Sequence, residues 1–384
     1  MSCKIFNLGE TVNSKRTKLF LGEDSCNRNI QTYHDPKYPW ILEFAEEMRA
    51  IGNWSKNEID LSKEKSDFDG LDEAGRHIYE SGLKFAITLD SCAGRAPLQL
   101  FNNGGISNNP EWELYITNHQ NNELLHSESY TEMVRAIYND VDVFIESIIE
   151  DEHIQKRASS ILGAFDWATS VFDRMDANLT AANHGMAKPF PEVTEKMIKT
   201  AIYKAAIVLN MFEGIRFFAT FVTAWSFSEQ PDKLMAGSSN IFKLIARDEN
   251  VHLASTQQML RLLPQEDKDF AKIKEETADE CKAMFVDAVE QEKQWADYLF
   301  KDGSIIGLNA ELLKQYVEFI AGKRMRAVGV DTDYNTGTNP LPWTMSWIAG
   351  GSVQVAPQET EISSYVIGGT KQDIDNNTLK GFSL

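Results

Sequence analysis

Two short motifs in the sequence pair a carboxylate with an imidazole three residues later, Glu123–His126 and Glu249–His252. Side chains three or four residues apart lie on the same face of an α-helix, so each pair presents two potential metal ligands together. Tyr130 shares the face of the first pair, about 6 Å beyond His126 along the helix axis. Two such pairs, with one carboxylate from each of two further helices, form a carboxylate-bridged two-metal site in some helical bundles.

Asp90 and Glu213 are the candidates for the two remaining carboxylates. Both interrupt apolar helical stripes, because Asp90 follows Ile87 by three residues and Glu213 follows Leu209 by four. A buried carboxylate without a partner is costly, and four of them on four helices are difficult to neutralise with ion pairs alone. Two divalent cations, or two ferric ions with a bridging oxide, would offset a formal charge of about −4.

The expected metal ligands are therefore Asp90, Glu123 and His126 for one ion, and Glu213, Glu249 and His252 for the other. Glu123 and Glu213 are the expected bridges, although spacing does not fix that assignment. Mixed carboxylate and imidazole ligands suit iron or manganese. Spacing does not distinguish di-iron from manganese–iron or di-manganese, but the presence of Tyr130 favours di-iron.

Three apolar side chains are expected beside Tyr130. Phe217 and Phe221 share the helical face of Glu213, and Ile245 lies one turn before the second Glu-x-x-His pair. A dry pocket of this kind would protect a phenoxyl radical from water and reductants. Ordinary core packing has the same spacing, and the two interpretations are compatible.

Two other histidines near carboxylates are not expected to bind metal. The third Glu-x-x-His pair, Glu150–His153, shares its stripe with Glu146 and Arg157, which indicates a solvated face. His119 precedes Glu123 by one helical turn, where it could hydrogen-bond a ligand or bring a third imidazole to the metal. A ligand role for it is not expected, because the set of six is already complete.

The elements that would hold these residues are long helices. Apolar periodicity predicts them at about 40–51, 71–92, 111–139, 141–185 with a break near 150–153, 192–228, 232–261, 266–301 and 309–327. Strand signals are sparse. An all-α bundle with inward-facing polar residues fits this pattern. We expect three parts: an irregular N-terminal arm (1–30), a helical metal-binding domain (31–350) and a flexible C-terminal tail (351–384).

The bulk composition excludes several classes of function. The net charge of −19 argues against nucleic acid as a partner, because duplex binding needs Lys and Arg to neutralise phosphates. No segment of about 20 apolar residues is evident, so no membrane span is expected, and the N-terminus lacks a signal peptide's apolar stretch. The four cysteines are far apart, which fits a reducing cytoplasm better than a disulfide framework or a zinc site.

From Leu19 to the C-terminus the chain resembles the small, radical-generating subunit of class I ribonucleotide reductase, of the aerobic bacterial and phage type. The blocks that carry the resemblance are Leu89–Arg95 (LDSCAGR), Glu123–Tyr130 (ELLHSESY), Glu213–Phe217 (EGIRF), Ala246–His252 (ARDENVH) and Val355–Tyr365 (VAPQETEISSY). Two positions depart from the family pattern: His119 stands where many members carry an indole, and Glu128 where an Arg is common.

The resemblance implies a ferritin-like bundle in which the six ligands hold two iron ions per chain (Fe–O–Fe). O2 and an electron donor would assemble this centre, which would oxidise Tyr130 to a stable radical. Phe217, Phe221 and Ile245 match the family's hydrophobic radical pocket. Trp54, Asp248 and Tyr365 match its proton-coupled electron path, in which His126 connects through Asp248 to Trp54.

The resemblance also implies the partners. Tyr365 would relay the oxidation to a cysteine of a separate large (alpha) subunit, and the extreme C-terminus, Leu379–Leu384, would dock on that subunit. The large subunit would reduce ribonucleoside diphosphates in a thioredoxin- or glutaredoxin-linked reaction that supplies deoxyribonucleotides for DNA replication. Family members are homodimers.

The sequence leaves three alternative functions open, two of which use the same metal ligands. A di-iron oxygenase acting on its own substrate would need an open substrate pocket and would not need Tyr130 or a tail tyrosine. An iron-storage ferroxidase would assemble into a large cage. A non-catalytic helical scaffold would bind no metal.

Overall fold

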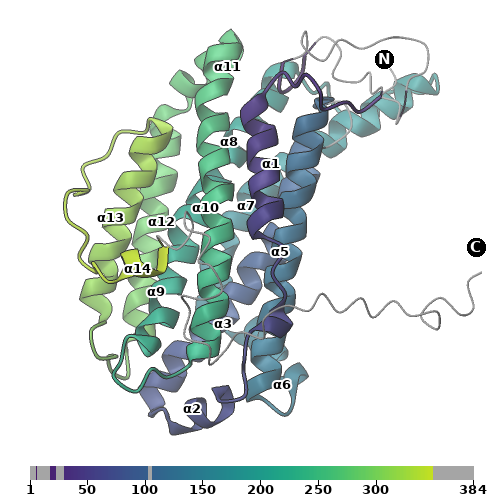
Figure 1. Ribbon diagram of the computed structural model, residues 1–384. Coiled ribbons are helices and arrows are strands. Elements are labelled where there is room, and N and C mark those ends of the chain that lie inside the picture. Colours follow the sequence, from purple (N-terminus) through teal and green to yellow (C-terminus); the bar gives the residue numbers. More distant parts are fainter. Residues whose placement is uncertain (1–5, 7–17, 23–29, 103–105, 349–384) are drawn as a thin grey trace, which may run out of the picture.

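The computed structural model describes residues 6, 18–22, 30–102 and 106–348, and regular structure within these residues is helical. The long helices stand side by side in one bundle (Figure 1). A single isolated bridge between Ile305 and Leu308 is the strand-like pairing found among the described residues. The predicted all-α, ferritin-like architecture is confirmed. The predicted N-terminal arm and C-terminal tail, including Tyr365 and Leu379–Leu384, lie almost entirely outside the described residues.

The elements in chain order are α1 (Pro39–Ile51), η2 (Lys56–Glu58), α2 (Glu64–Gly70), α3 (Glu73–Ala93), α4 (Ala96–Phe101), α5 (Pro110–Ile137), α6 (Val141–Glu150), α7 (Glu152–Asn183), α8 (Glu195–Met211), η3 (Phe212–Arg216), α9 (Phe217–Ser228), α10 (Ala236–Glu266), α11 (Lys268–Glu276), α12 (Ala278–Leu299), α13 (Ala310–Val328) and α14 (Thr344–Ile348). The predicted helices α3, α5 and α13 lie within a few residues of their expected bounds. The short elements η2, α2, α4 and α14 were not predicted from apolar periodicity.

Local side chains explain several helix boundaries. Asp72 caps α3 by accepting a hydrogen bond from Gly75 N, as N-cap residues do. The expected break near residues 150–153 falls at Asp151, which ends α6 and caps α7 through the amides of His153 and Ile154. Ser55 caps only the short 3₁₀ turn η2.

The segment expected as one helix over 192–228 is three elements in the structure. Its middle, η3, is a π-helical turn that carries Glu213. A π-turn places an extra residue in one helical turn, so the faces of α8 and α9 are offset from one another. Periodicity cannot reveal a single such turn. The segment expected over 266–301 is likewise two helices, which meet at Thr277.

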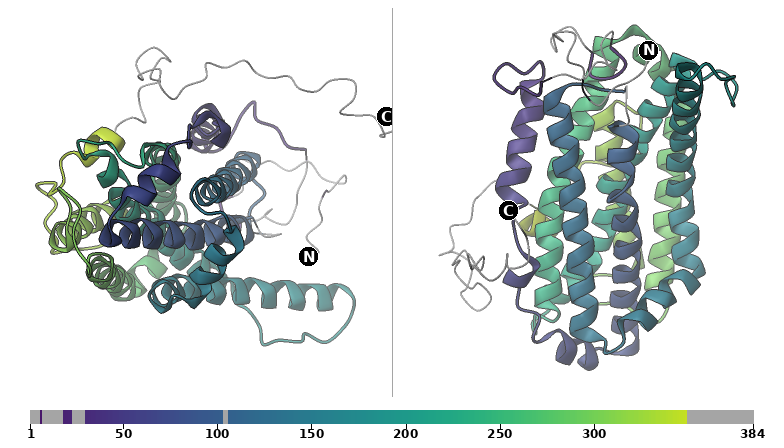
Figure 2. Two further views of the ribbon diagram at one scale, coloured as in Figure 1. Left: turned by 90° about the horizontal axis from the view of Figure 1, so that it is seen from below. Right: turned by 90° about the vertical axis from the view of Figure 1, so that its right-hand side faces the viewer.

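Helices α8 and α9 with η3 form the buried centre of the bundle. Figure 2 shows the bundle of long helices from below and from the side. The stretch Glu195–Ser228 is long and apolar enough to cross a membrane by length and composition, contrary to the expectation from the sequence. Its most apolar window is entirely enclosed by the other helices, as is typical of the core helix of a large bundle. Its apolar character therefore reflects core packing.

Candidate metal centre

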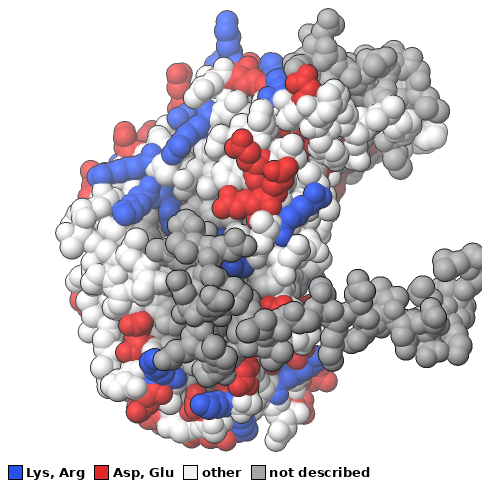
Figure 3. Space-filling view, in the orientation of Figure 1, with Lys and Arg blue, Asp and Glu red and all other residues white. Residues whose placement is uncertain are grey.

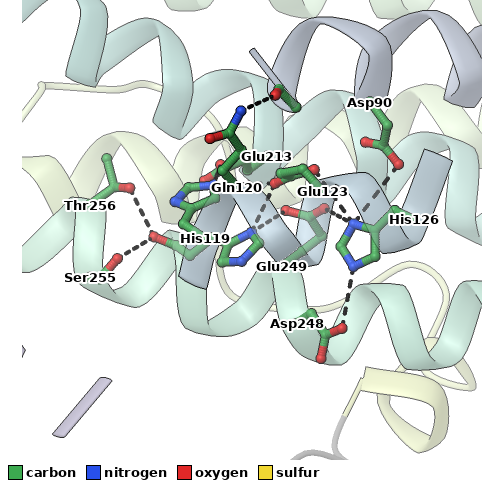
Figure 4. Close-up of polar contacts among 12 residues, drawn as sticks. Asp90, His119, Gln120, Glu123, His126, Glu213, Asp248, Glu249, Ser255 and Thr256 are labelled. Atoms are coloured by element: carbon green, nitrogen blue, oxygen red, sulfur yellow. Dashed lines mark hydrogen bonds and ion pairs between the residues drawn. The ribbon is translucent and has the colours of Figure 1, made fainter. Parts of the chain in front are cut away.

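The six predicted ligands converge at one place inside the bundle, although they come from four separate elements (Figure 4). Helix α3 supplies Asp90, α5 supplies Glu123 and His126, η3 supplies Glu213, and α10 supplies Glu249 and His252. All six side chains are completely buried. Helices α3, α5, α9 and α10 pack against one another around this point.

One group of potential ligand atoms surrounds His126. Its Nδ1 atom lies 3.5 Å from Glu123 Oε2, 3.4 Å from Glu249 Oε1 and 3.9 Å from Asp90 Oδ2. One ligand atom from each of these four residues lies within 4.8 Å of the others. This spacing fits a single metal ion held by three carboxylates and one imidazole.

A second group contains His252, Glu213 and, against expectation, His119. His252 Nδ1 lies 3.1 Å from Glu123 Oε1, and His119 Nε2 lies 3.0 Å from Glu213 Oε1. Ligand atoms of His119, Glu123, Glu213 and His252 also lie within 4.8 Å of one another. Glu123 thus belongs to both groups.

The carboxylates that lie between the two groups are Glu123 and Glu249. Glu249 Oε1 faces His126, while its Oε2 lies 3.3 Å from His252 Nδ1. Among the described residues, Glu213 belongs to the second group, with His119, and not to the first. The geometry therefore favours Glu249 over Glu213 as the second bridging carboxylate, in contrast to the expected assignment.

The unpaired polar atoms of this cluster fit a pair of cations. Both oxygens of Asp90 and of Glu213, together with His126 Nδ1, are buried and have no hydrogen-bond partner in the described part of the chain. The ion pairs described for the four carboxylates are with histidines, and none is with Lys or Arg. Buried polar atoms without partners are costly, and two metal ions would satisfy them.

The carboxylates also have strongly altered proton affinities. Burial, and then the charge of Glu123, raises the pKa of Asp90 well above its usual range. Burial raises the pKa of Glu213 to about 7. Burial would also raise the pKa of Glu123, but hydrogen bonds from three imidazoles outweigh it and hold that pKa well below its usual range. Glu123 is therefore the carboxylate best stabilised as an anion before any cation binds.

Tyr130 lies beside this cluster and next to Asp90. Its side chain is fully buried, and burial followed by the charge of Asp90 raises the pKa of the phenol well above its usual value. The predicted neighbours Phe217, Phe221 and Ile245 are all fully buried. The nearest aromatic ring is Phe242, whose centroid lies 5.6 Å from that of Tyr130.

Phe242 was not predicted from the sequence. Its ring packs against both Tyr130 and Phe221, one of the predicted neighbours. Its ring lies 5.8 Å from that of Phe221, which stacks on Phe217 at 5.6 Å. Phe242 stands seven residues before Glu249, on the same helical face, so the spacing used to find Ile245 could have found it.

A short hydrogen-bonded chain leads from the metal cluster toward the surface of the bundle. Asp248 Oδ2 accepts a hydrogen bond of 2.8 Å from the indole of Trp54 and lies 3.2 Å from His126 Nε2. The Trp54 and His126 rings are also nearly parallel, with centroids 6.3 Å apart. The structure therefore brings together three of the residues expected in an electron path.

Long helices that carry two carboxylate–imidazole groups around a shared glutamate define a ferritin-like protein with a di-metal carboxylate site. The sequence matches the family model for the ribonucleotide reductase small chain over residues 31–340. The chain is 39% identical over 359 residues to ribonucleoside-diphosphate reductase 1 subunit beta of Escherichia coli O157:H7, covering 93% of this chain and 94% of that protein. The chain therefore belongs to the ribonucleotide reductase small-chain family, and it is the radical-generating small subunit of a ribonucleoside-diphosphate reductase.

A more distant relative agrees with this assignment, and two solved structures share the fold. The chain is 30% identical over 344 residues to subunit beta of Enterobacteria phage T4, covering 86% of this chain and 87% of that one. Its fold is similar to the R2 subunit from Clostridium botulinum, with a TM-score of 0.74 at 23% identity over 91% of this chain and 98% of that structure. It is also similar, with a TM-score of 0.60 at 18% identity over 83% of this chain and 97% of that structure, to the dimanganese(II) NrdF of Streptococcus sanguinis.

Proposed function

We propose that the site holds two iron ions and that Tyr130 is the residue that stores the radical. The observation that carries this proposal is the pair of ligand groups sharing Glu123, with a fully buried phenol beside Asp90. When bound, the ions would supply the oxidising equivalents, drawn from O2, that remove one electron from Tyr130, and the phenol proton would leave toward Asp90, the carboxylate that neighbours the hydroxyl. Asp90, Glu123, His126, Glu213, Glu249 and His252 would be the ligands.

The pocket around Tyr130 supports a long radical lifetime. A neutral phenoxyl radical is quenched by water, thiols and other reductants, so it persists only where these are excluded. Phe242 packs beside the phenol and begins a run of rings that continues through Phe221 to Phe217, and none of the three is exposed beyond 1%. Asp90 is the polar neighbour of the Tyr130 hydroxyl, and its charge contributes to the raised pKa of the phenol.

Asp248 is suited to couple proton and electron movement between His126 and Trp54. Its Oδ2 atom contacts both rings, so a change of charge at one ring is felt at the other. We propose that oxidising equivalents pass along this chain and then through Tyr365, which lies outside the described residues, to the large subunit. A carboxylate fixed between an indole and a metal-binding imidazole also sets the orientation of that imidazole.

We further propose that the chain works as a homodimer in the cytoplasm and binds the large subunit through Leu379–Leu384. Membership of the family implies the large-subunit partner. On the face shown in Figure 3, basic side chains are interspersed with acidic ones, and the net charge is −19, which offers little to a nucleic acid.

The arrangement favours radical storage over an oxygenase reaction on a separate substrate. A cavity of about 330 Å³ opens between α3, α4 and α7, and its wall includes Leu89 and Phe212, the chain neighbours of Asp90 and Glu213. None of the six proposed ligands lines that cavity. An oxygenase needs its substrate within reach of the metal ions.

The test is electron paramagnetic resonance of the metal-free protein after addition of Fe(II) and O2. We expect a phenoxyl signal in the wild-type protein and none in Tyr130→Phe, with two iron ions bound in both. A phenoxyl signal that survives in Tyr130→Phe, or a wild-type protein that binds two iron ions without a radical, would contradict the proposal.

A further inference from the structure

His119 is the residue of the metal cluster whose role the six-ligand scheme leaves open. It lies on α5, one turn before Glu123, and is completely buried. Its Nε2 atom points into the cluster, 3.0 Å from Glu213 Oε1 and 3.2 Å from Glu123 Oε1. These distances match the edge of an octahedron, where neighbouring ligand atoms lie about 3.0 Å apart if each metal bond is about 2.1 Å.

The metal-free contacts of His119 Nε2 are with the carboxylates of the second ligand group. Nε2 is hydrogen-bonded to Glu123 Oε1 at 3.2 Å and pairs with Glu213 Oε1 at 3.0 Å. One ligand atom from each of His119, Glu123, Glu213 and His252 lies within 4.8 Å of the others, so a cation between them would replace these hydrogen bonds with metal bonds.

The opposite nitrogen of His119 is fixed in the way usual for a metal-binding histidine. Nδ1 lies 3.4 Å from the hydroxyl of Tyr115, which is hydrogen-bonded to Ser255. Ser255 in turn donates to the backbone oxygen of His252, at 2.8 Å. Metal-binding imidazoles commonly donate the N–H of their other nitrogen to an outer partner, and Asp248 plays that part for His126.

We propose that His119 binds the second metal ion through Nε2, together with Glu123, Glu213 and His252. This inference rests on the proposed two-metal function of the site and deepens it. The second ion would then have two imidazole ligands and the first ion one, so the two positions differ in chemistry. Nitrogen ligands strengthen binding of later first-row metals, so the second position would favour iron over manganese more strongly than the first.

The ring packing predicts a small movement when the ion binds. The His119 and His252 rings are stacked, with centroids 3.8 Å apart and 17° between their planes. Parallel rings cannot both aim a nitrogen lone pair at one ion, so the rings must tilt apart. The torsion that turns an imidazole about its Cβ–Cγ bond is broad and allows this.

The experiment is a crystal structure of the full-length protein loaded anaerobically with Mn(II), located by anomalous scattering. We expect two Mn(II) ions, with His119 Nε2 at bonding distance, about 2.2 Å, from the one beside Glu213. Two ions with His119 Nε2 more than about 3 Å from either, donating a hydrogen bond to Glu213, would overturn this inference alone. Failure to bind two ions at all would overturn the proposed site as well.

Solution measurements on His119→Gln provide a second readout. Competition with a chelator should show the second Mn(II) ion bound about 100-fold more weakly, with the first ion little changed. Pulsed electron paramagnetic resonance of protein labelled with ¹⁵N-histidine should show one fewer coupled imidazole than in the wild type. Equal numbers of coupled imidazoles in the two proteins would overturn the inference even if the affinity fell.

The matched control is His153→Gln, which changes the solvated histidine of the third Glu-x-x-His motif. His153 is exposed and stacks on Tyr298, away from the cluster. Its replacement should leave Mn(II) stoichiometry and nitrogen couplings unchanged. A loss of metal equal to that of His119→Gln would show a general effect on folding and would count against the inference.

Discussion

The carboxylates of the metal centre differ in the number of imidazoles that they contact, and Glu123 contacts the most. Its oxygens lie 3.1–3.5 Å from three imidazoles, those of His119, His126 and His252. Asp90 instead lies only in the first group. The consequences of losing each carboxylate should therefore differ in kind as well as in size.

Glu123→Ala should abolish binding of both metal ions, because both ligand groups lose a member. Asp90→Ala should weaken the first ion strongly and leave the second nearly intact. Anaerobic Fe(II) titration followed by iron analysis distinguishes the two variants. Equal stoichiometry in both would show that Glu123 is not shared between the ions.

Asp248→Asn should separate radical formation from radical use. The amide keeps an oxygen that can accept hydrogen bonds, but it carries no negative charge and cannot take up and release a proton between Trp54 and His126, so transfer should fail while Tyr130 is still oxidised. We expect activity with the large subunit to fall by at least about 10- to 100-fold, with the radical signal largely retained. Trp54→Phe is the companion variant and should behave in the same way; normal turnover in either would exclude this path.

At the scale of elements, the π-helical turn η3 is held by a buried ion-pair network. Glu292 on α12 accepts a hydrogen bond of 2.6 Å from Arg157 Nε. It accepts another, of 3.2 Å, from Nη1 of Arg216, the last residue of η3. Arg324 donates to Gly214 O inside the same turn, at 3.2 Å. Burial lowers the pKa of Arg157 to about 10, yet Glu292 keeps both guanidinium groups charged. The network fixes the backbone that presents Glu213.

Glu292→Gln should therefore destabilise the fold by about 3 kcal/mol, because two buried guanidinium groups lose their counter-charge. It should also weaken metal binding at Glu213 more than at Asp90. Glu290→Gln, on the same helix but exposed, is the control and should cost less than about 1 kcal/mol. Urea unfolding of the metal-free proteins measures both, and equal midpoints would contradict the prediction.

The junction of α10 and α11 gives a pH-dependent prediction. Burial alone would raise the pKa of Asp267, but hydrogen bonds from Lys18 and Lys199 outweigh it and lower that pKa to about 2. A depressed carboxyl pKa adds stability above the unfolded value of about 3.9, and this stability is lost as pH falls toward 2.

Asp267→Asn keeps the helix-capping oxygen and removes only the charge. We expect it to cost about 1 kcal/mol at pH 7, allowing for solvent screening of the two lysines. The difference from wild type should shrink as pH falls from 4 toward 2. Thermal unfolding at several pH values measures it, and a difference that persists at the lowest pH would disprove the ion-pair explanation.

At the scale of the whole molecule, metal chemistry and partner binding should be separable. The ligand groups, Tyr130 and Trp54 all lie within residues 54–252 of the bundle. The residues expected to reach the large subunit lie after residue 348. Each function should therefore survive the loss of the other.

Deleting Leu379–Leu384 should leave iron content, the radical signal and thermal stability unchanged, and should abolish turnover when the large subunit is added. A synthetic peptide of these six residues should compete with the full-length chain for the large subunit. Normal turnover of the shortened chain would place the docking segment elsewhere.

The sequence by itself determined the class of fold and the six converging ligands, because helical periodicity places i, i+3 and i+4 residues on one face wherever a helix forms. It also predicted Phe217, Phe221 and Ile245 as apolar neighbours of Tyr130; all three are buried, and their role as a radical pocket stays a prediction. Only the tertiary structure decided what lies across from each face: His119 beside Glu213, Phe242 beside Tyr130, and Glu249 between two imidazoles. The π-turn under Glu213 also escaped detection, because one extra residue leaves no periodic signal. Contacts between helices depend on packing and rotation that spacing along one chain does not encode.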